Sequence, residues 1–227
     1  VLGMGLGGIF GGLFAILVEQ LVITRLYERH IDQALVTVGV SLVGGAMLSG
    51  WFGSDARLIA IPGWYYNTIS LFGATIPVDR FLYIGVALSI YLVCMGILKF
   101  TRIGLIIRAG VENRNMVNAL GINVKVAFTM VFFLGGFVAG IGGVLIGSYS
   151  SGVSAFMAAS WLIYGFIVVV VGGMGSLTGS ALAALLIGIT KQFSNFYIAG
   201  LGDFVVVLLL GVVLLTRPQG LLGRKNN

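Results

Sequence analysis

Long apolar runs, separated by short segments that hold most of the charges, dominate this sequence. A helix of about 20 apolar residues is as long as the hydrocarbon core of a bilayer is thick, about 30 Å. Lipid offers no hydrogen-bond partners, so a spanning helix must satisfy its own backbone, and none of the three prolines falls inside a run. The sequence therefore predicts an all-α, polytopic integral membrane bundle, one transmembrane domain over residues 1–227, with about seven transmembrane helices at roughly 1–24, 34–52, 81–99, 126–147, 155–173, 178–198 and 203–216.

Composition excludes the alternative of a water-soluble globular protein. Only 9% of the residues are charged and 59% are hydrophobic, whereas soluble domains carry about 25% charged residues. The single cysteine, Cys94, cannot form an intrachain disulfide. No charged segment precedes the first apolar run, so we expect no signal peptide.

The placement of basic residues predicts the orientation, because short cytoplasmic loops keep an excess of Lys and Arg. With the segment around Arg25 in the cytoplasm, ten of the thirteen Lys and Arg fall inside. The N-terminus is then outside and the C-terminus cytoplasmic, with an outer loop at about 53–80 and a basic cytoplasmic loop at about 100–125. The fifth and sixth spans could instead be two half-helices that enter from outside. The basic residues border apolar runs, so we expect them to face anionic lipid rather than nucleic acid.

Enzyme signatures are missing from the sequence. The glycine-rich run Gly172–Gly179 lacks the lysine of a phosphate-binding loop. One histidine, His30, and one cysteine cannot build a metal cluster or a Cys/His dyad. We therefore expect no catalytic, cofactor-binding or metal-binding residues, and no enzyme.

Ionisable residues inside a membrane mark ion paths in many carriers. The candidates here are Glu19, Lys191 and Asp203, each placed near the end of a predicted span. We expect them to be interfacial or structural. An ion-coupled carrier or channel, in which they would be essential, is the alternative from another class, and a membrane subunit without a pore of its own is a third.

Glycines at spacing i, i+4 predict close helix packing. Such pairs begin at Gly7, Gly8, Gly136 and Gly143. The glycines of the run at 172–179 are poor helix formers and predict a cytoplasmic turn or a break between half-helices.

The basic loop is too polar to span the membrane, and residues 108–120 predict a short helix within it. Arg108 and Glu112 can pair at i, i+4, Met116 and Leu120 stack one turn apart, and Gly121 supplies the stop. This helix could lie on the lipid surface or dock its apolar ridge into a groove of another protein. Composition leaves the two uses open.

The outer loop contains an aromatic cluster, Trp64, Tyr65 and Tyr66. Aromatic residues gather at membrane interfaces by default, so we favour an interfacial belt over a partner site.

Motifs in three regions of the chain resemble one known family. Thr101–Gly104, Arg108-Ala109, Asn113–Met116 and Ala119–Asn123 in the basic loop, together with the 172–179 run and the tail Arg217–Leu221, are similar to permease subunits of branched-chain amino acid ABC importers. The resemblance is close over about 99–225. Members usually have one or more spans before the region that resembles residues 1–23, so we expect this chain to be truncated or unusually short. Relatives for urea or short amides share the late motifs and remain an alternative.

The resemblance implies a permease domain in the bacterial inner membrane that works by alternating access. Its implied partners are a second homologous permease subunit, two cytoplasmic ATPase subunits that use ATP, a periplasmic substrate-binding protein and the lipid bilayer. The loop becomes an ATPase-coupling element with the residues Arg102, Gly104, Arg108, Ala109, Glu112, Asn113, Met116, Ala119, Leu120 and Gly121. The helix break or turn consists of Gly172, Gly173, Gly175 and Gly179.

Overall fold

The computed structural model describes residues 2–26, 30–58, 63–71, 74–112, 114–121, 123–217 and 219–223. The chain divides into two compact units, Val1–Phe156 and Met157–Asn227, and each is described here by itself. The expectation of a single domain stays a prediction. Helices dominate both units, which confirms the all-α membrane fold class.

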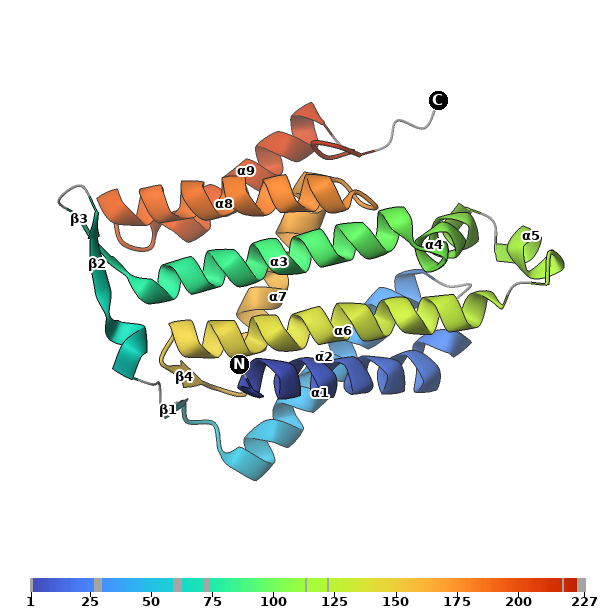
Figure 1. The fold of residues 1–227 in the computed structure, drawn as a ribbon, viewed down its shortest axis with the longest axis horizontal. Coiled ribbons are helices and arrows are strands. Elements are labelled where there is room, and N and C mark those ends of the chain that lie inside the picture. The colour runs from blue at the N-terminus through green and yellow to red at the C-terminus, as the bar shows by residue number, and fades with distance from the viewer. Residues whose placement is uncertain are drawn as a thin grey trace. The chain divides into compact units, whose positions relative to one another are not determined.

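Unit 1 contains four long apolar helices and two short ones (Figure 1). The long helices are α1 (Leu2–Leu21), α2 (His30–Phe52), α3 (Val78–Phe100) and α6 (Val124–Tyr149). A 3₁₀ turn, η1 (Ile23–Arg25), follows α1, and the short helices α4 (Arg102–Glu112) and α5 (Arg114–Ala119) connect α3 to α6.

The outer loop contains short β-strands and a 3₁₀ helix, which the all-helical prediction did not include. Strands β2 (Thr68–Leu71) and β3 (Ala74–Pro77) form an antiparallel hairpin, and the 3₁₀ helix η2 (Gly63–Tyr66) precedes it. Strand β1 (Arg57–Leu58) pairs with β4 (Gly152–Val153), which follows α6. The β1–β4 pair holds the loop after α2 beside the loop after α6, so both loops lie at one end of unit 1.

Unit 2 consists of α7 (Met157–Gly172), α8 (Leu177–Tyr197) and α9 (Leu201–Thr216). Its core contains Ile167 and Val171 of α7, Ala183 and Ile187 of α8, and Val206 of α9. Small and branched side chains let the three helices approach closely without large gaps.

Seven helices occupy the seven predicted positions, but not all of them are full spans. Among the described residues, α1, α2, α3 and α6 are long and apolar enough to cross a membrane. The axes of α7 and α8 differ by 119° across a short break, the geometry of a broken span or a re-entrant loop. Helix α9 has 16 residues and is about 24 Å long, shorter than the hydrocarbon core. The count of seven full crossings is therefore not confirmed, and the half-helix alternative for α7 and α8 gains support.

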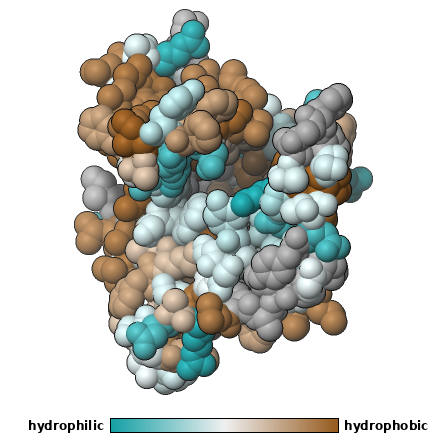
Figure 2. Space-filling view, turned by 90° about the vertical axis from the view of Figure 1, so that its left-hand side faces the viewer, coloured by the Kyte–Doolittle hydropathy of each residue, from teal (hydrophilic) through white to brown (hydrophobic). Residues whose placement is uncertain are grey.

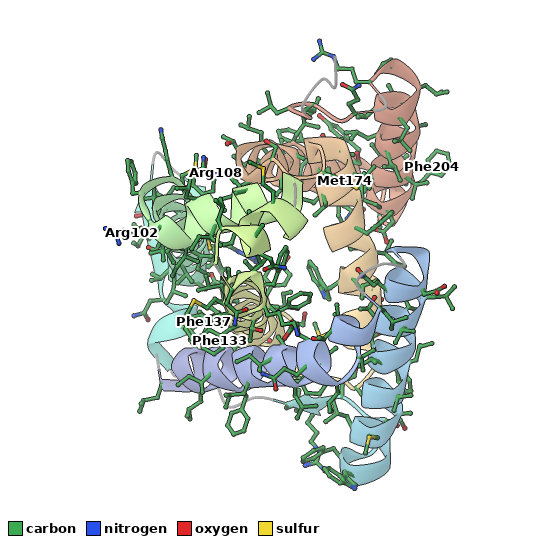
Figure 3. The ribbon with its side chains drawn as sticks, turned by 90° about the vertical axis from the view of Figure 1, so that its right-hand side faces the viewer. Arg102, Arg108, Phe133, Phe137, Met174 and Phe204 are labelled. Atoms are coloured by element: carbon green, nitrogen blue, oxygen red, sulfur yellow. The ribbon has the colours of Figure 1, made fainter. Side chains whose placement is uncertain are left out.

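Helices α1 and α6 run antiparallel and lie side by side (Figure 1), with glycines of each facing the other. A Cβ atom at Gly11 would collide with the carbonyl oxygen of Gly136, and one at Gly140 with that of Gly7. Phenylalanine rings from α6 cover the next positions, because a Cβ at Gly8 would lie 2.8 Å from Phe137. Figure 3 labels Phe137 and its neighbour Phe133 at this contact. The predicted packing role is confirmed for the pairs that begin at Gly7, Gly8 and Gly136, whereas Gly143 has no neighbour within 4 Å.

The packing predicts that Gly136→Ala destabilises the protein although alanine favours a helix. The new methyl group would overlap the Gly11 backbone and the Ala15 side chain, and overpacking of this kind costs about 1–3 kcal/mol. Unfolding temperature in detergent micelles measures the effect. The matched control is Gly135→Ala on the same helix, where a Cβ meets nothing within 4 Å and no loss is expected. Equal unfolding temperatures for the two variants would contradict the close contact.

Candidate functional site

The basic loop forms a helix earlier than the sequence analysis expects. Helix α4 begins at Arg102, six residues before the predicted start, because the Thr101 hydroxyl caps it by accepting a hydrogen bond from the Gly104 amide at 3.2 Å. Gly104 is buried, and a side chain there would collide with the backbone of Leu98 at the end of α3. The absence of a side chain thus lets the chain turn sharply from α3 into α4.

The helix predicted at 108–120 is wrong in its start, which lies at Arg102. The structure describes helix on both sides of residue 113, as α4 and α5, and Asn113 itself lies outside the described residues. Gly121 ends the second helix at a φ of +77°, which confirms the predicted stop. The predicted Arg108–Glu112 ion pair also falls outside the description, because the Glu112 side chain is not described. The described bond of Arg108 goes from its Nε to the Gly104 carbonyl oxygen, at 3.2 Å.

One face of the α4–α5 element is fixed to α6. A Cβ at Gly110 would lie 3.0 Å from Val124, which is fully buried, and Val117 of α5 is also buried. The side chain of Asn123 caps α6 by accepting a hydrogen bond from the Lys125 amide at 3.1 Å. A displacement of α4 would therefore act directly on the first turn of α6.

The same element also exposes apolar side chains. Met116 is 63% exposed and Leu120 is 69% exposed, and they lie one turn apart, as predicted. Ala119 is exposed beside them, and Ala109 on α4 is half-buried. Arg102 and Arg108 of α4 are exposed and labelled in Figure 3. The surface thus combines an apolar ridge with positive charge, which suits a protein groove that carries acidic residues.

The glycine-rich run forms the turn between α7 and α8. Ser176 caps α8 by accepting a hydrogen bond from the Gly179 amide at 3.0 Å. Gly172 packs against the backbone of Gly179 and Ser180, where a Cβ would lie 2.5 Å from the Ser180 Cα. Gly173 and Gly175 have φ angles of +98° and +86°, in the left-handed region that favours glycine. The predicted helix break is therefore present at these residues.

The turn and the C-terminal tail, separate motifs in the sequence, form one structure. The amide of Leu221 donates to the Val171 carbonyl oxygen at 2.8 Å, and that of Leu222 donates to Gly172 at 3.1 Å. A Cβ at Gly220 would collide with the backbone of Gly173, and a Cβ at Gly173 would collide with the backbone of Gly223. The sequence signal for this contact was the recurrence of glycine in both motifs, and the pairing itself was missed.

Three ionisable residues had been candidates for ion coupling. Glu19 of α1 is only 2% exposed and accepts hydrogen bonds from the hydroxyls of Thr129 on α6, at 3.0 Å, and of Thr24, at 3.3 Å. Its position at the α1–α6 contact gives it a structural role, as expected, although it is buried rather than interfacial.

Lys191 of α8 and Asp203 of α9 form an ion pair at 3.0 Å. Tyr164 of α7, which the sequence analysis did not single out, joins them. Lys191 donates to its hydroxyl at 2.7 Å, and that hydroxyl donates to Asp203 at 2.5 Å. The three groups connect all three helices of unit 2. Within the described part of the chain, no three His, Cys, Asp or Glu residues are grouped so that they could hold a metal ion.

Long apolar helices joined by an exposed basic element define a multi-pass membrane protein. Residues 1–216 match the model of the family described as branched-chain amino acid transport system / permease component. The chain belongs to this family.

Curated relatives agree with this family. The chain is 28% identical over 175 residues to the high-affinity branched-chain amino acid transport system permease protein LivH of Salmonella typhimurium, which covers 74% of the chain and 57% of the relative. It is 30% identical over 204 residues to BraD of Pseudomonas aeruginosa, a permease protein of the same description, which covers 83% and 62%. The chain thus spans about half to three fifths of the length of these relatives. No solved structure matches it.

The contact between turn and tail predicts that Gly173→Ala releases the tail. A methyl group there would overlap the backbone of Gly223 and the carbonyl oxygen of Gln219, and it would also strain a backbone with φ of +98°. With Cys94 replaced by Ala and a reporter cysteine at the partly buried Leu221, the rate of maleimide labelling is expected to rise about tenfold, since about 1.4 kcal/mol of docking energy is lost. The control is Gly175→Ala, which has a similar φ but no neighbour within 4 Å. Equal rates in both variants would exclude the contact.

Proposed function

We propose that this chain is a permease subunit of an ATP-binding-cassette importer that moves branched-chain amino acids across the inner membrane by alternating access. Energy comes from two separate ATPase subunits, a second permease completes the pathway, and a periplasmic binding protein delivers the substrate. The chain needs no cofactor of its own. Family membership supports the transport role, and the similarity to the branched-chain amino acid permease proteins LivH and BraD supports the substrate. Importers of urea or short amides are the alternative within this class.

The observation that carries the proposal is the exposed ridge of Met116 and Leu120 on an element fixed to α6. A partner that binds this ridge would move α4 and α5 when it changes conformation. The contact of Gly110 with Val124 would then pass the movement to α6. The glycine contact between α6 and α1 then carries it to a second span. An ion-coupled carrier needs no such docking element, and the Lys191–Asp203 pair and Glu19 already have partners within the protein.

The coupling role predicts that Met116→Glu combined with Leu120→Glu abolishes binding of the ATPase subunit. Both side chains are exposed, so folding is expected to persist while charge replaces the apolar ridge. Co-purification of the ATPase is expected to fall at least tenfold, together with ATP-dependent uptake. The matched control is Leu58→Glu, an equally apolar and exposed residue in the outer loop. Undiminished co-purification in correctly inserted double mutant would refute the coupling role, and uptake driven by an ion gradient without ATPase would favour the rival carrier.

The topology predicts opposite accessibility for the two loops. With Cys94 replaced by Ala, a cysteine at Leu58 is expected to react with a membrane-impermeant maleimide in intact spheroplasts. A cysteine at Leu120 is expected to react only after permeabilisation, because the element that contacts the ATPase lies in the cytoplasm together with the C-terminus. Both side chains are exposed, so burial does not bias the comparison. The reverse pattern would invert the orientation.

A further inference from the structure

The first turn of α3 contains a buried carboxylate that lacks a hydrogen-bond donor. Asp79 is 9% exposed, and its Oδ1 atom receives no hydrogen bond from any described residue. A buried acceptor without a donor is costly, and more so when it is charged. The position therefore needs a physical reason.

Nearby groups stabilise this charge only in part. The N-terminus of α3 favours an acidic residue in its first turn. The Nε of Arg80 lies 3.8 Å from Oδ2, which is too long for a hydrogen bond. Arg80 instead places its guanidinium 4.6 Å from the centre of the Tyr149 ring, and its side chain is 46% exposed. The Oδ1 atom is left for a further donor.

Three tyrosines from separate segments of unit 1 form a cluster around Tyr83, one helical turn after this carboxylate. Tyr83 lies one helical turn after Asp79, on the same face of α3 and within electrostatic range of it. Its hydroxyl is hydrogen-bonded to that of Tyr65 in η2, and their ring centres are 6.1 Å apart. Tyr149, at the end of α6, packs edge-on against Tyr83 at 6.0 Å. Aromatic faces and a carboxylate together favour a cation.

We propose that Asp79, Tyr65, Tyr83 and Tyr149 form a binding site for a primary ammonium group. The ammonium would donate to Oδ1, and the tyrosines would supply aromatic faces and hydroxyl oxygens. Arg80 would reach the carboxylate of the same molecule, since guanidinium and carboxylate pair well. This pattern fits the zwitterionic end of an α-amino acid.

Two sources can present this ammonium group. One is a free amino acid at the outer mouth of the transporter, an assignment that rests on the proposed function. The other is the headgroup of an aminophospholipid, because the cluster lies beside the β2–β3 hairpin at the end of a membrane-spanning helix. Figure 2 faces the side on which Figure 1 shows this hairpin, and hydrophilic residues lie there among hydrophobic ones.

Binding of radiolabelled leucine to the full chain in phosphatidylglycerol nanodiscs, which contain no amine, tests the site. Unlabelled 3-methylbutylamine, which is leucine without its carboxylate, is expected to compete at least tenfold better than 4-methylpentanoate, which is leucine without its ammonium. Asp79→Asn is nearly isosteric and removes the charge, so leucine affinity should fall at least tenfold. Asp55→Asn, an exposed residue of the same outer loop, is the matched control and should bind normally.

A second arm adds phosphatidylethanolamine to the nanodiscs. If the headgroup shares the site, the lipid weakens leucine binding to the wild type but not the residual binding to Asp79→Asn. If the headgroup is the sole occupant, leucine does not bind in either disc, and native mass spectrometry finds phosphatidylethanolamine retained by the wild type and lost from the variant. Either result supports the ammonium site.

Asp79→Asn with a wild-type unfolding temperature and unchanged leucine and lipid binding would overturn the proposal. So would equal competition by the amine and the acid. Co-purification of the ATPase, measured on the same variants, reports the proposed function separately. A wild-type chain that retains the ATPase but binds no ammonium compound refutes only this site.

Discussion

The backbone contact between α1 and α6 is the interaction on which unit 1 depends. Lipid offers no hydrophobic force between helices, so close packing has to supply the attraction. Glycines at 7, 11, 136 and 140 remove the side chains that would separate the two backbones. The hydroxyl of Thr129 then bonds to the buried Glu19 at the other end of the contact. A polar group is tolerated there because its partner lies across the same contact.

Glycine has a different use in the basic loop and in unit 2. Gly104 permits the sharp turn from α3 into α4, and Gly110 lets α4 lie against Val124. Gly173 and Gly220 allow the tail to add two hydrogen bonds to the end of α7. In each case the missing side chain allows two segments of the chain to pack closely together. The exposed ridge of Met116 and Leu120 thus belongs to an element that packs closely against α6.

Polar side chains also connect elements that are distant in sequence. Tyr164, Lys191 and Asp203 connect the three helices of unit 2, and their charges satisfy one another. Asp79 differs, since one of its oxygens receives no hydrogen bond from the residues that the structure describes, although Asp79 is buried. A charge that the protein leaves incompletely satisfied is a better candidate for a ligand contact than one that it has neutralised.

The sequence by itself determined that lipid surrounds the protein, that the fold is helical, where the seven long helices lie and which residues form the basic loop. The length of an apolar run and the charge beside it are properties of a single segment. The sequence also predicted the glycine packing of α1 and α6, but not which glycines face each other. The early start of α4, the bend between α7 and α8, the turn–tail contact and the tyrosines around Asp79 appeared only in the tertiary structure. These features depend on a capping hydroxyl or on contacts between segments distant in sequence, such as those of Tyr83 with Tyr65 and with Tyr149. No local pattern of apolar and charged residues encodes such distances.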